Sequence, residues 1–363
     1  MMQPIPESRK ISPFLVFFLI HAIQVGAGVL GFQRIIAKTA GYDGWISVIL
    51  AGVTTHIIML IMYLLLDKGG GDLVSAHAIV FGKWIGKAVD IFFVLYFTLL
   101  VITIIRTYIE VVQVWMYPRL STFYFALAFM ILAYYIVSGG VRNIAGVAFF
   151  GTVLPSYLLL TFAFTFPYSD FRNILPVFDH SLKDMIMATK NMSLTFLGYE
   201  SILLLYPFIK NAKKSQKYAH WGLFTTTTVY VIIAVTSFAF FSEKQLAKTV
   251  WATLSMWKIV EMPFVERFEY IGIANWCLVI LPNVCIALWC ASRIMKRITP
   301  LNQRHSIWIL SIIVIGTLTF ITDRKQVNIL NSLSGEIGFY LNYGYIPLLL
   351  IVVIIMKKVR KKA

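Results

Sequence analysis

Long apolar runs separated by short polar segments fill almost the whole of this 363-residue chain. A helix needs about 20 apolar residues to cross the hydrocarbon core of a bilayer. Runs of that length predict an all-α integral membrane protein with ten transmembrane helices. The expected spans cover residues 11–33, 45–66, 89–115, 122–138, 144–166, 185–208, 218–241, 264–292, 307–321 and 337–356.

Two of these spans contain glycines at places where an unbroken helix would be expected. The first span is interrupted at residues 24–28 and the sixth at residues 197–200. A freed backbone group finds no water in hydrocarbon, so an unwound segment persists only where it lines a cavity or meets a ligand. Paired interruptions of this kind indicate a binding site for a small solute near the middle of the membrane.

At the first interruption, Gly26 and Gly28 leave the backbone exposed. The helix that resumes at Val29 would point its first N–H groups at the cavity, and the positive end of a helix favours a carboxylate. In the alternative interpretation, the glycines only let two helices pack closely. That role usually spaces small residues four positions apart, whereas these two are two apart.

Glu200 directly follows the second interruption, close to the middle of the bilayer. An ionised carboxylate at that depth costs a few kcal/mol unless it is protonated, paired or hydrated. One interpretation is that Glu200 contacts the ligand or exchanges a proton. The other is that it stays neutral and hydrogen-bonds the loosened backbone of the interruption.

Four more ionisable side chains lie inside the expected spans. Arg106 and Glu110 are one helical turn apart in the third span, and we expect them to neutralise each other. His21 and His56 lie in the first two spans, where a lone histidine usually makes a hydrogen bond between helices.

Composition agrees with a membrane protein, because 59% of the residues are hydrophobic, only 13% are charged and the mean hydropathy is +0.79. A net charge of +16 would suggest a nucleic-acid partner in a soluble protein, but here the Lys and Arg residues gather in loops that fall on one side. That side is predicted to be cytoplasmic and to hold both termini. The three cysteines are expected to be reduced packing residues: Cys277, Cys285 and Cys290.

Two loops show a near-helical spacing of apolar residues. Residues 246–260, on the acidic side, predict an amphipathic helix over the mouth of the bundle, and residues 73–84, on the basic side, predict a second interfacial segment. Both patterns also fit simple aromatic anchors at the membrane interface. We expect neither an enzyme nor a cofactor or metal, since no span combines a nucleophile with a base or spaces His, Asp and Glu as metal ligands.

The layout with glycine-interrupted first and sixth spans resembles the amino acid–polyamine–organocation superfamily. This resemblance implies a LeuT-type fold, in which residues 1–363 form one bundle of two inverted five-helix repeats, about 11–166 and 185–356. Three stretches are similar to the spore germination permease family, the B subunits of nutrient germinant receptors. They run from Phe196 to Pro207, from Glu266 to Trp276 and from Gln24 to Leu30.

The family resemblance implies a subunit in the inner membrane of the spore that senses a nutrient, expected to be an amino acid, and triggers germination when it binds. Its partners would be an A-type subunit with soluble domains, a lipoprotein C-type subunit and membrane lipid, but no nucleic acid. Val101 and Asn283 are assigned to the site by their depth alone. The expected ligand-binding residues are Gln24, Gly26, Gly28, Val101, Leu197, Gly198, Tyr199, Glu200 and Asn283. The alternative function is a proton-coupled amino-acid permease, because one fold can serve both roles.

Overall fold

The computed structural model describes residues 5–362, with side chains to residue 359, and these residues form helices joined by short loops, with no strand. Seven helical stretches are apolar and long enough to cross a membrane: Phe32–Lys68, Leu73–Trp115, Val141–Tyr168, Ala212–Phe240, Phe268–Ile298, Gln303–Phe320 and Arg324–Val359. Two shorter helices, Leu15–Gln24 and Thr122–Ser138, are also apolar. The prediction of an all-α membrane protein is confirmed, while the count of ten spans stays a prediction.

Seventeen α-helices are labelled in chain order. In the first half of the chain they are α1 (Leu15–Gln24), α2 (Phe32–Ala40), α3 (Gly44–Lys68), α4 (Leu73–Trp115), α5 (Thr122–Ser138), α6 (Val141–Val153) and α7 (Tyr157–Leu160). In the second half they are α8 (Leu182–Asn191), α9 (Ser193–Phe196), α10 (Ile202–Leu205), α11 (Gln216–Phe240), α12 (Glu243–Lys248), α13 (Ala252–Trp257), α14 (Phe268–Ile298), α15 (Gln303–Phe320), α16 (Arg324–Tyr340) and α17 (Ile346–Lys362).

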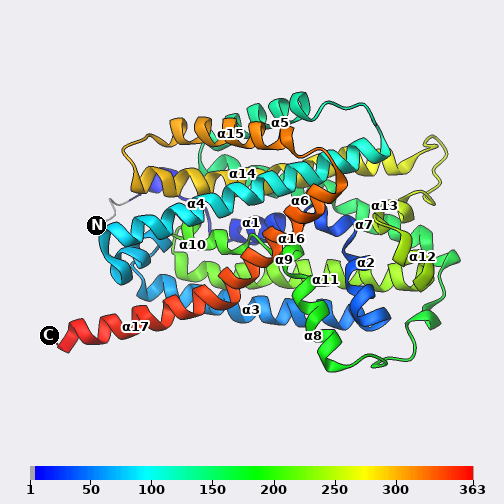
Figure 1. Cartoon of the computed structure of the whole chain (residues 1–363), viewed down its shortest axis with the longest axis horizontal. Coiled ribbons are helices and arrows are strands. Elements are labelled where there is room, and N and C mark those ends of the chain that lie inside the picture. The colour runs from blue at the N-terminus through cyan, green and yellow to red at the C-terminus, as the bar shows by residue number, and fades with distance from the viewer. Residues whose placement is uncertain (1–4, 363) are drawn as a thin grey trace.

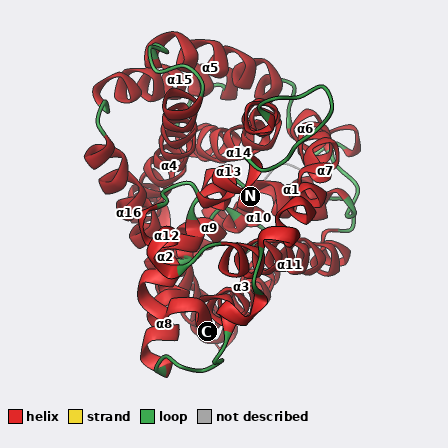
Figure 2. Ribbon diagram, turned by 90° about the vertical axis from the view of Figure 1, so that its right-hand side faces the viewer, coloured by secondary structure: helices red, strands yellow, loops and turns green. Residues whose placement is uncertain are grey.

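The long helices α4 and α14 pack along each other through the bundle, and α1 lies between α11, α6 and α14. Helices α5 and α15 form one edge of the molecule, and α3 and α8 lie at the opposite edge, in both Figure 1 and Figure 2. The interrupted α1 and the short helices α9 and α10 therefore lie in the interior of the bundle. Apolar residues from nearly every helix form one continuous core around them.

The described chain starts and finishes at the same end of the bundle, while α12 and α13 lie at the other end (Figure 1). This arrangement agrees with an even number of spans. Helix α12 starts with a capping box between Ser242 and Gln245, and α16 starts with one between Asp323 and Gln326. Both boxes satisfy backbone N–H groups that a helix start leaves free, so both starts are fixed by local sequence.

Two loop predictions differ from the structure in detail. The stretch 246–260 does not form one helix: α12 ends at Lys248, and α13 begins only at Ala252. Residues 73–84 belong to α4, but Gly82 has φ +72° and turns the chain there, so the first part of α4 is a separate segment folded against the bundle. A residue with a side chain rarely adopts that φ, which makes glycine the natural residue for this kink.

Candidate ligand-binding site

The first interruption is supported by α14. Helix α1 ends at Gln24, a short turn covers Ala27–Leu30, and α2 continues from Phe32. The amide nitrogen of Asn283 donates to the carbonyls of Ile23 (3.1 Å) and Val25 (3.3 Å). A Cβ on Gly26 would lie 2.8 Å from that nitrogen, so a glycine is needed where α14 approaches the opened backbone.

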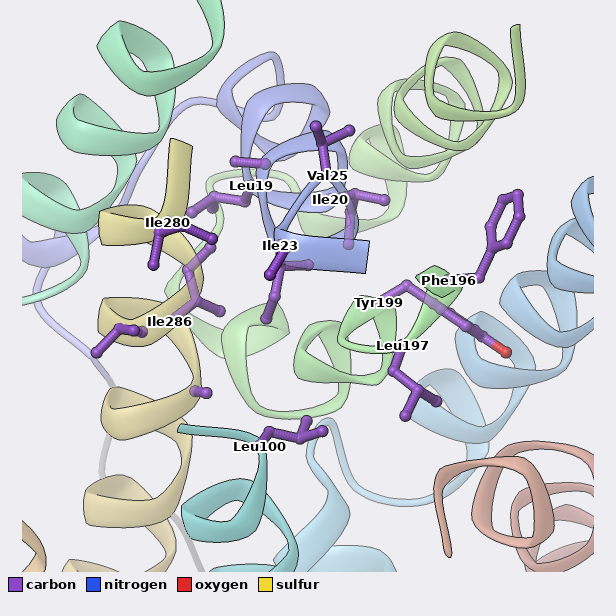
Figure 3. Close-up of a cluster of buried hydrophobic side chains, with 14 of the residues drawn as sticks. Leu19, Ile20, Ile23, Val25, Leu100, Phe196, Leu197, Tyr199, Ile280 and Ile286 are labelled. Carbon is purple, nitrogen blue, oxygen red and sulfur yellow. The ribbon is translucent and has the colours of Figure 1, made fainter. Parts of the chain in front are cut away.

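The second interruption follows α9, which ends at Phe196. Gly198 has φ +106°, and a Cβ there would lie 2.5 Å from Cγ1 of Ile23. Gly198 is therefore required for two independent reasons, its backbone conformation and the close approach of the first interruption. A turn at Tyr199–Ser201 then leads into α10. In Figure 3, Ile23, at the end of α1, lies on the side that faces the second interruption, where Leu197 and Tyr199 are drawn.

Two side chains join the interruptions directly. Nε2 of Gln24 donates a 2.9 Å hydrogen bond to the carbonyl of Phe196. The hydroxyl of Tyr230, on α11, lies 2.9 Å from the carbonyl of Gln24 and 3.2 Å from that of Thr195. Tyr230 was not among the expected site residues, although a tyrosine in an apolar span signals a hydroxyl that needs a buried partner.

A cavity of about 370 Å³ lies where the two interruptions meet. Six of the expected site residues line it: Gln24, Gly26, Gly28, Leu197, Gly198 and Asn283. Helix α4 contributes Leu100, Thr103, Ile104 and Thr107, which share one helical face. Val101 is fully buried and is not among the lining residues, because it is one position further round α4.

Tyr199 and Glu200 are also buried but do not line the cavity. The carboxyl of Glu200 accepts hydrogen bonds from the Tyr96 hydroxyl (2.5 Å), the Gly198 N–H (2.9 Å) and the Asn342 amide (3.4 Å). Tyr96 belongs to α4, and Asn342 to a single π-helical turn, Leu341–Tyr345, between α16 and α17. Glu200 thus holds the backbone of the second interruption and links it to two neighbouring spans.

Arginines stand near α13 at the outer mouth of the cavity, the mouth that faces away from the end of the bundle with the termini (Figure 1). Nη1 of Arg324 pairs with Oε1 of Glu110 at 2.6 Å, and the guanidinium lies over the ring of Trp251. Arg34, on α2, also lines the cavity, and among the described residues it has no hydrogen-bond or ion-pair partner. The unpaired Arg34 near this opening favours an anionic group.

The expected pairing of Arg106 with Glu110 is wrong. Arg106 donates instead to the carbonyls of Ile321 (2.6 Å) and Thr322 (3.1 Å), at the end of α15. These carbonyls are at the end of a helix and have no N–H partner in a following turn, so they accept hydrogen bonds from the guanidinium of Arg106. Glu110 pairs with Arg324 instead. The sequence did not show this because the partners are more than 200 residues away.

The remaining polar candidates have structural partners. Nδ1 of His21 lies 2.9 Å from the Thr226 hydroxyl, and Nδ1 of His56 lies 2.7 Å from Nδ1 of His220, so each histidine joins two helices. The cysteines are free thiols inside or along α14. Within residues 5–362, no group of three or more His, Cys, Asp or Glu side chains could hold a metal ion.

The fold and the paired interruptions define a multi-pass membrane protein with a LeuT-type fold. A solved structure titled as the substrate-bound, outward-open state of a Na⁺-coupled sialic acid symporter matches with a TM-score of 0.67. The match covers 95% of this chain and 79% of the symporter, at 14% identity, and so shows the fold alone. The sequence profile described as "Spore germination protein" matches residues 10–327, and the chain belongs to that family.

Characterised relatives carry the same description. The chain is 44% identical to spore germination protein GerQB of Bacillus cereus, covering 99% of this chain and 100% of the relative. It is 29% identical to spore germination protein B2 of Bacillus subtilis (strain 168), covering 89% of each. These relatives are germination proteins rather than enzymes, in agreement with the expectation from the sequence.

Proposed function

We propose that this chain is the nutrient-sensing B-type subunit of a spore germinant receptor, and that an amino acid binds in the cavity between the two interruptions. One observation carries the proposal: residues 24–28 and 197–200 are far apart in the chain, yet they meet at one cavity in a member of the germination family. The volume of about 370 Å³ suits a small molecule, since such sites usually measure ~300–1,000 Å³.

The groups around the cavity suit the two charged ends of an amino acid. Oε1 of Gln24 and Oδ1 of Asn283 are buried acceptors without a hydrogen-bond partner among the described residues, and an ammonium group supplies donors. Arg34, at the outer mouth, suits the carboxylate. Leu100 and Leu197 supply an apolar wall for a side chain.

Binding would favour one arrangement of the bundle over another, because a ligand shifts an equilibrium by its difference in affinity for the two states. Gly198 lines the cavity, and its N–H is bonded to Glu200. A displacement of Gly198 would therefore reach α4 through Tyr96 and the π-helical turn through Asn342. This route supports a coupling between ligand arrival and the surfaces that partner subunits contact.

The proposal includes the location and partners that the sequence suggests. The protein would lie in the spore inner membrane with both termini cytoplasmic, assembled with an A-type subunit and a lipoprotein C-type subunit. The first segment of α4, up to the kink at Gly82, and the start of α11 lie at the end of the bundle that also holds both termini (Figure 1), and the exposed Lys214 directly precedes α11. They suit the docking of a soluble domain.

The second candidate function is a proton-coupled amino-acid permease. The observation that favours it is Glu200, a buried carboxyl next to the cavity-lining Gly198. Uptake separates the two functions: vesicles containing the purified protein should bind a labelled nutrient without accumulating it. Accumulation driven by a pH gradient would favour the permease.

The decisive test is a germination assay. Spores that lack the native gene and carry this one should germinate with a defined amino acid, and the Asn283→Leu variant should lose that response at equal protein level. A normal response of the variant would remove the cavity from the proposed function.

A further inference from the structure

A second, larger cavity of about 790 Å³ lies at the other end of the bundle from the outer mouth, among the ends of α5, α6, α14 and α15. Five cationic side chains line it: Arg9, Arg142, Arg293, Lys296 and Arg304. No Asp or Glu is among its lining residues, and nothing in the proposed ligand site involves it.

The cations of this basic cavity have no direct ion-pair partner among the described residues. Among the described residues, none of the five cations forms an ion pair with a carboxylate, because the nearby acids are already engaged. Asp72 pairs with Arg297 at 2.6 Å, and Glu7 pairs with Lys10 at 2.7 Å. A concave surface with charges of one sign concentrates the opposite charge, so an anion is the expected occupant.

Two of the cations are held in place by contacts that leave their charge available. Arg142 donates to the backbone carbonyls of Lys10 (3.1 Å) and Glu7 (3.4 Å), and the guanidinium of Arg293 lies 4.8 Å from the ring centre of Phe208. The charges of Arg9 and Arg293 also act on Lys296. Holding like charges together is unfavourable, and a bound anion would relieve that repulsion.

The cavity opens beside an apolar surface. Its wall includes the rings of Tyr134 and Trp308, whose centres are 4.7 Å apart, on the edge helices α5 and α15. On the same two helices, Tyr135 and Ile312 are largely exposed. Aromatic rings at a helix end, next to exposed apolar residues, are typical of the level where lipid headgroups meet acyl chains.

We propose that this basic cavity binds the headgroup of an anionic phospholipid, with the phosphate among Arg293, Lys296 and Arg304 and the acyl chains along α5 and α15. Basic pockets between transmembrane helices recognise anionic headgroups in this way. A free phosphate ion shares the headgroup chemistry, but it makes no use of the adjoining apolar surface. An acidic protein segment is a different kind of partner, and competition with the lipid distinguishes it from a lipid headgroup.

The test uses the purified full chain in a neutral detergent, titrated with phosphatidylglycerol or phosphatidylcholine labelled on the acyl chain. Phosphatidylglycerol should bind at least about tenfold more tightly. Each cation near an anionic lipid contributes about a fivefold factor in affinity. The triple variant Arg293→Gln, Lys296→Gln, Arg304→Gln should therefore lose most of the preference.

The matched control removes three exposed lysines from the same end of the bundle as the basic cavity. The substitutions are Lys210→Gln, Lys214→Gln and Lys217→Gln. It should keep the preference for phosphatidylglycerol. Thermal unfolding checks that both triple variants are folded. If the cavity variant is not, the single variant Lys296→Gln replaces it, with an expected loss of about fivefold.

Equal affinity for the two lipids, or equal losses in the two triple variants, would overturn the proposal. If inorganic phosphate binds the wild-type cavity and phosphatidylglycerol binds no better than phosphatidylcholine, the site is assigned to a free anion instead. A polyglutamate peptide that binds there and is not displaced by phosphatidylglycerol would assign it to an acidic protein segment. Displacement of the peptide by the lipid would support the lipid site.

Discussion

The side chain of Gln24, at the end of α1, donates its 2.9 Å hydrogen bond to the carbonyl of Phe196, at the end of α9, and so joins the two interrupted spans. Replacing it by methionine keeps the size and removes the donor. An unpaired buried carbonyl costs about 1–3 kcal/mol, so Gln24→Met should lower the free energy of unfolding by that amount and should raise the nutrient concentration needed for germination.

Gln33→Met is the matched control for that change. Gln33 is buried and donates to the Thr253 hydroxyl at 2.7 Å, but it does not line the cavity between the two interruptions, the central cavity. It should lose similar stability in thermal unfolding and keep its nutrient sensitivity. If both variants lost sensitivity equally, the effect of Gln24 would be one of stability and not of the site.

The glycines of the interruptions should differ in their tolerance to substitution. Gly198→Ala must place a Cβ against Ile23 at φ +106°, whereas Gly26→Ala meets only the side chain of Asn283. We expect Gly198→Ala to abolish the nutrient response and Gly26→Ala to weaken it, measured by dose-response curves at matched protein levels. Gly316→Ala on α15 is the control, because a Cβ there meets nothing within 4 Å. A normal response of Gly198→Ala would contradict the structure at the second interruption.

Substitutions of Glu200 can distinguish a structural role of its carboxyl group from a role that requires its ionisation. In Glu200→Gln, the amide oxygen can accept from Gly198 and Asn342, and the amide nitrogen can donate to the Tyr96 hydroxyl. The variant should therefore keep the wild-type unfolding temperature. Glu200→Ala leaves these groups unpaired and should lose at least about 1–3 kcal/mol of stability.

We expect germination to fail in both Glu200 variants. If Glu200 only made hydrogen bonds, a glutamine could do the same without the cost of burying an ionisable side chain, so the presence of a glutamate favours a role for its ionisation. The measurement is the nutrient dose-response at equal protein level. A wild-type response in Glu200→Gln would show that ionisation of Glu200 is not needed.

Arg34 should report on the charge of the ligand. Arg34→Gln removes a cation from the outer mouth without breaking an ion pair of the described structure. The concentration of amino acid needed for half-maximal germination should rise about tenfold, which corresponds to about 1.4 kcal/mol. Lys38→Gln, on the same helix but outside the central cavity, should leave the response unchanged. If Arg34→Gln raised the half-maximal concentration of an uncharged nutrient by the same factor, Arg34 would not be recognising a carboxylate.

The orientation can be tested with single cysteines at exposed positions. Lys214→Cys should react with a membrane-impermeant thiol reagent from the cytoplasmic side, and Lys183→Cys from the opposite side. Cys285 and Cys290 are buried, and the partly exposed Cys277 is first replaced by serine to keep the background low. The reverse labelling pattern would place the outer mouth, with Arg34 and Arg324, in the cytoplasm.

The sequence predicted the elements of the fold better than the contacts of the site. Apolar runs and glycines are local signals, so the helices and both interruptions could be located from the chain. The partners of Glu110 and Glu200 lie on other helices, and the pairing of side chains across a bundle depends on rotations that no local pattern contains. Val101 is an example. Its depth in the membrane could be inferred from the sequence, but the direction in which its side chain points from α4 could not, and it does not line the cavity.

The hydroxyl of Tyr230 carries a single proton, yet it lies within reach of carbonyls from both interrupted spans. It can donate strongly to only one of them at a time. If the two spans move apart here, the hydroxyl can keep its hydrogen bond to either carbonyl, so the separation costs one shared bond at Tyr230 in addition to the bond between Gln24 and Phe196. Tyr230 can therefore remain bonded to one of the two interrupted spans when the other moves.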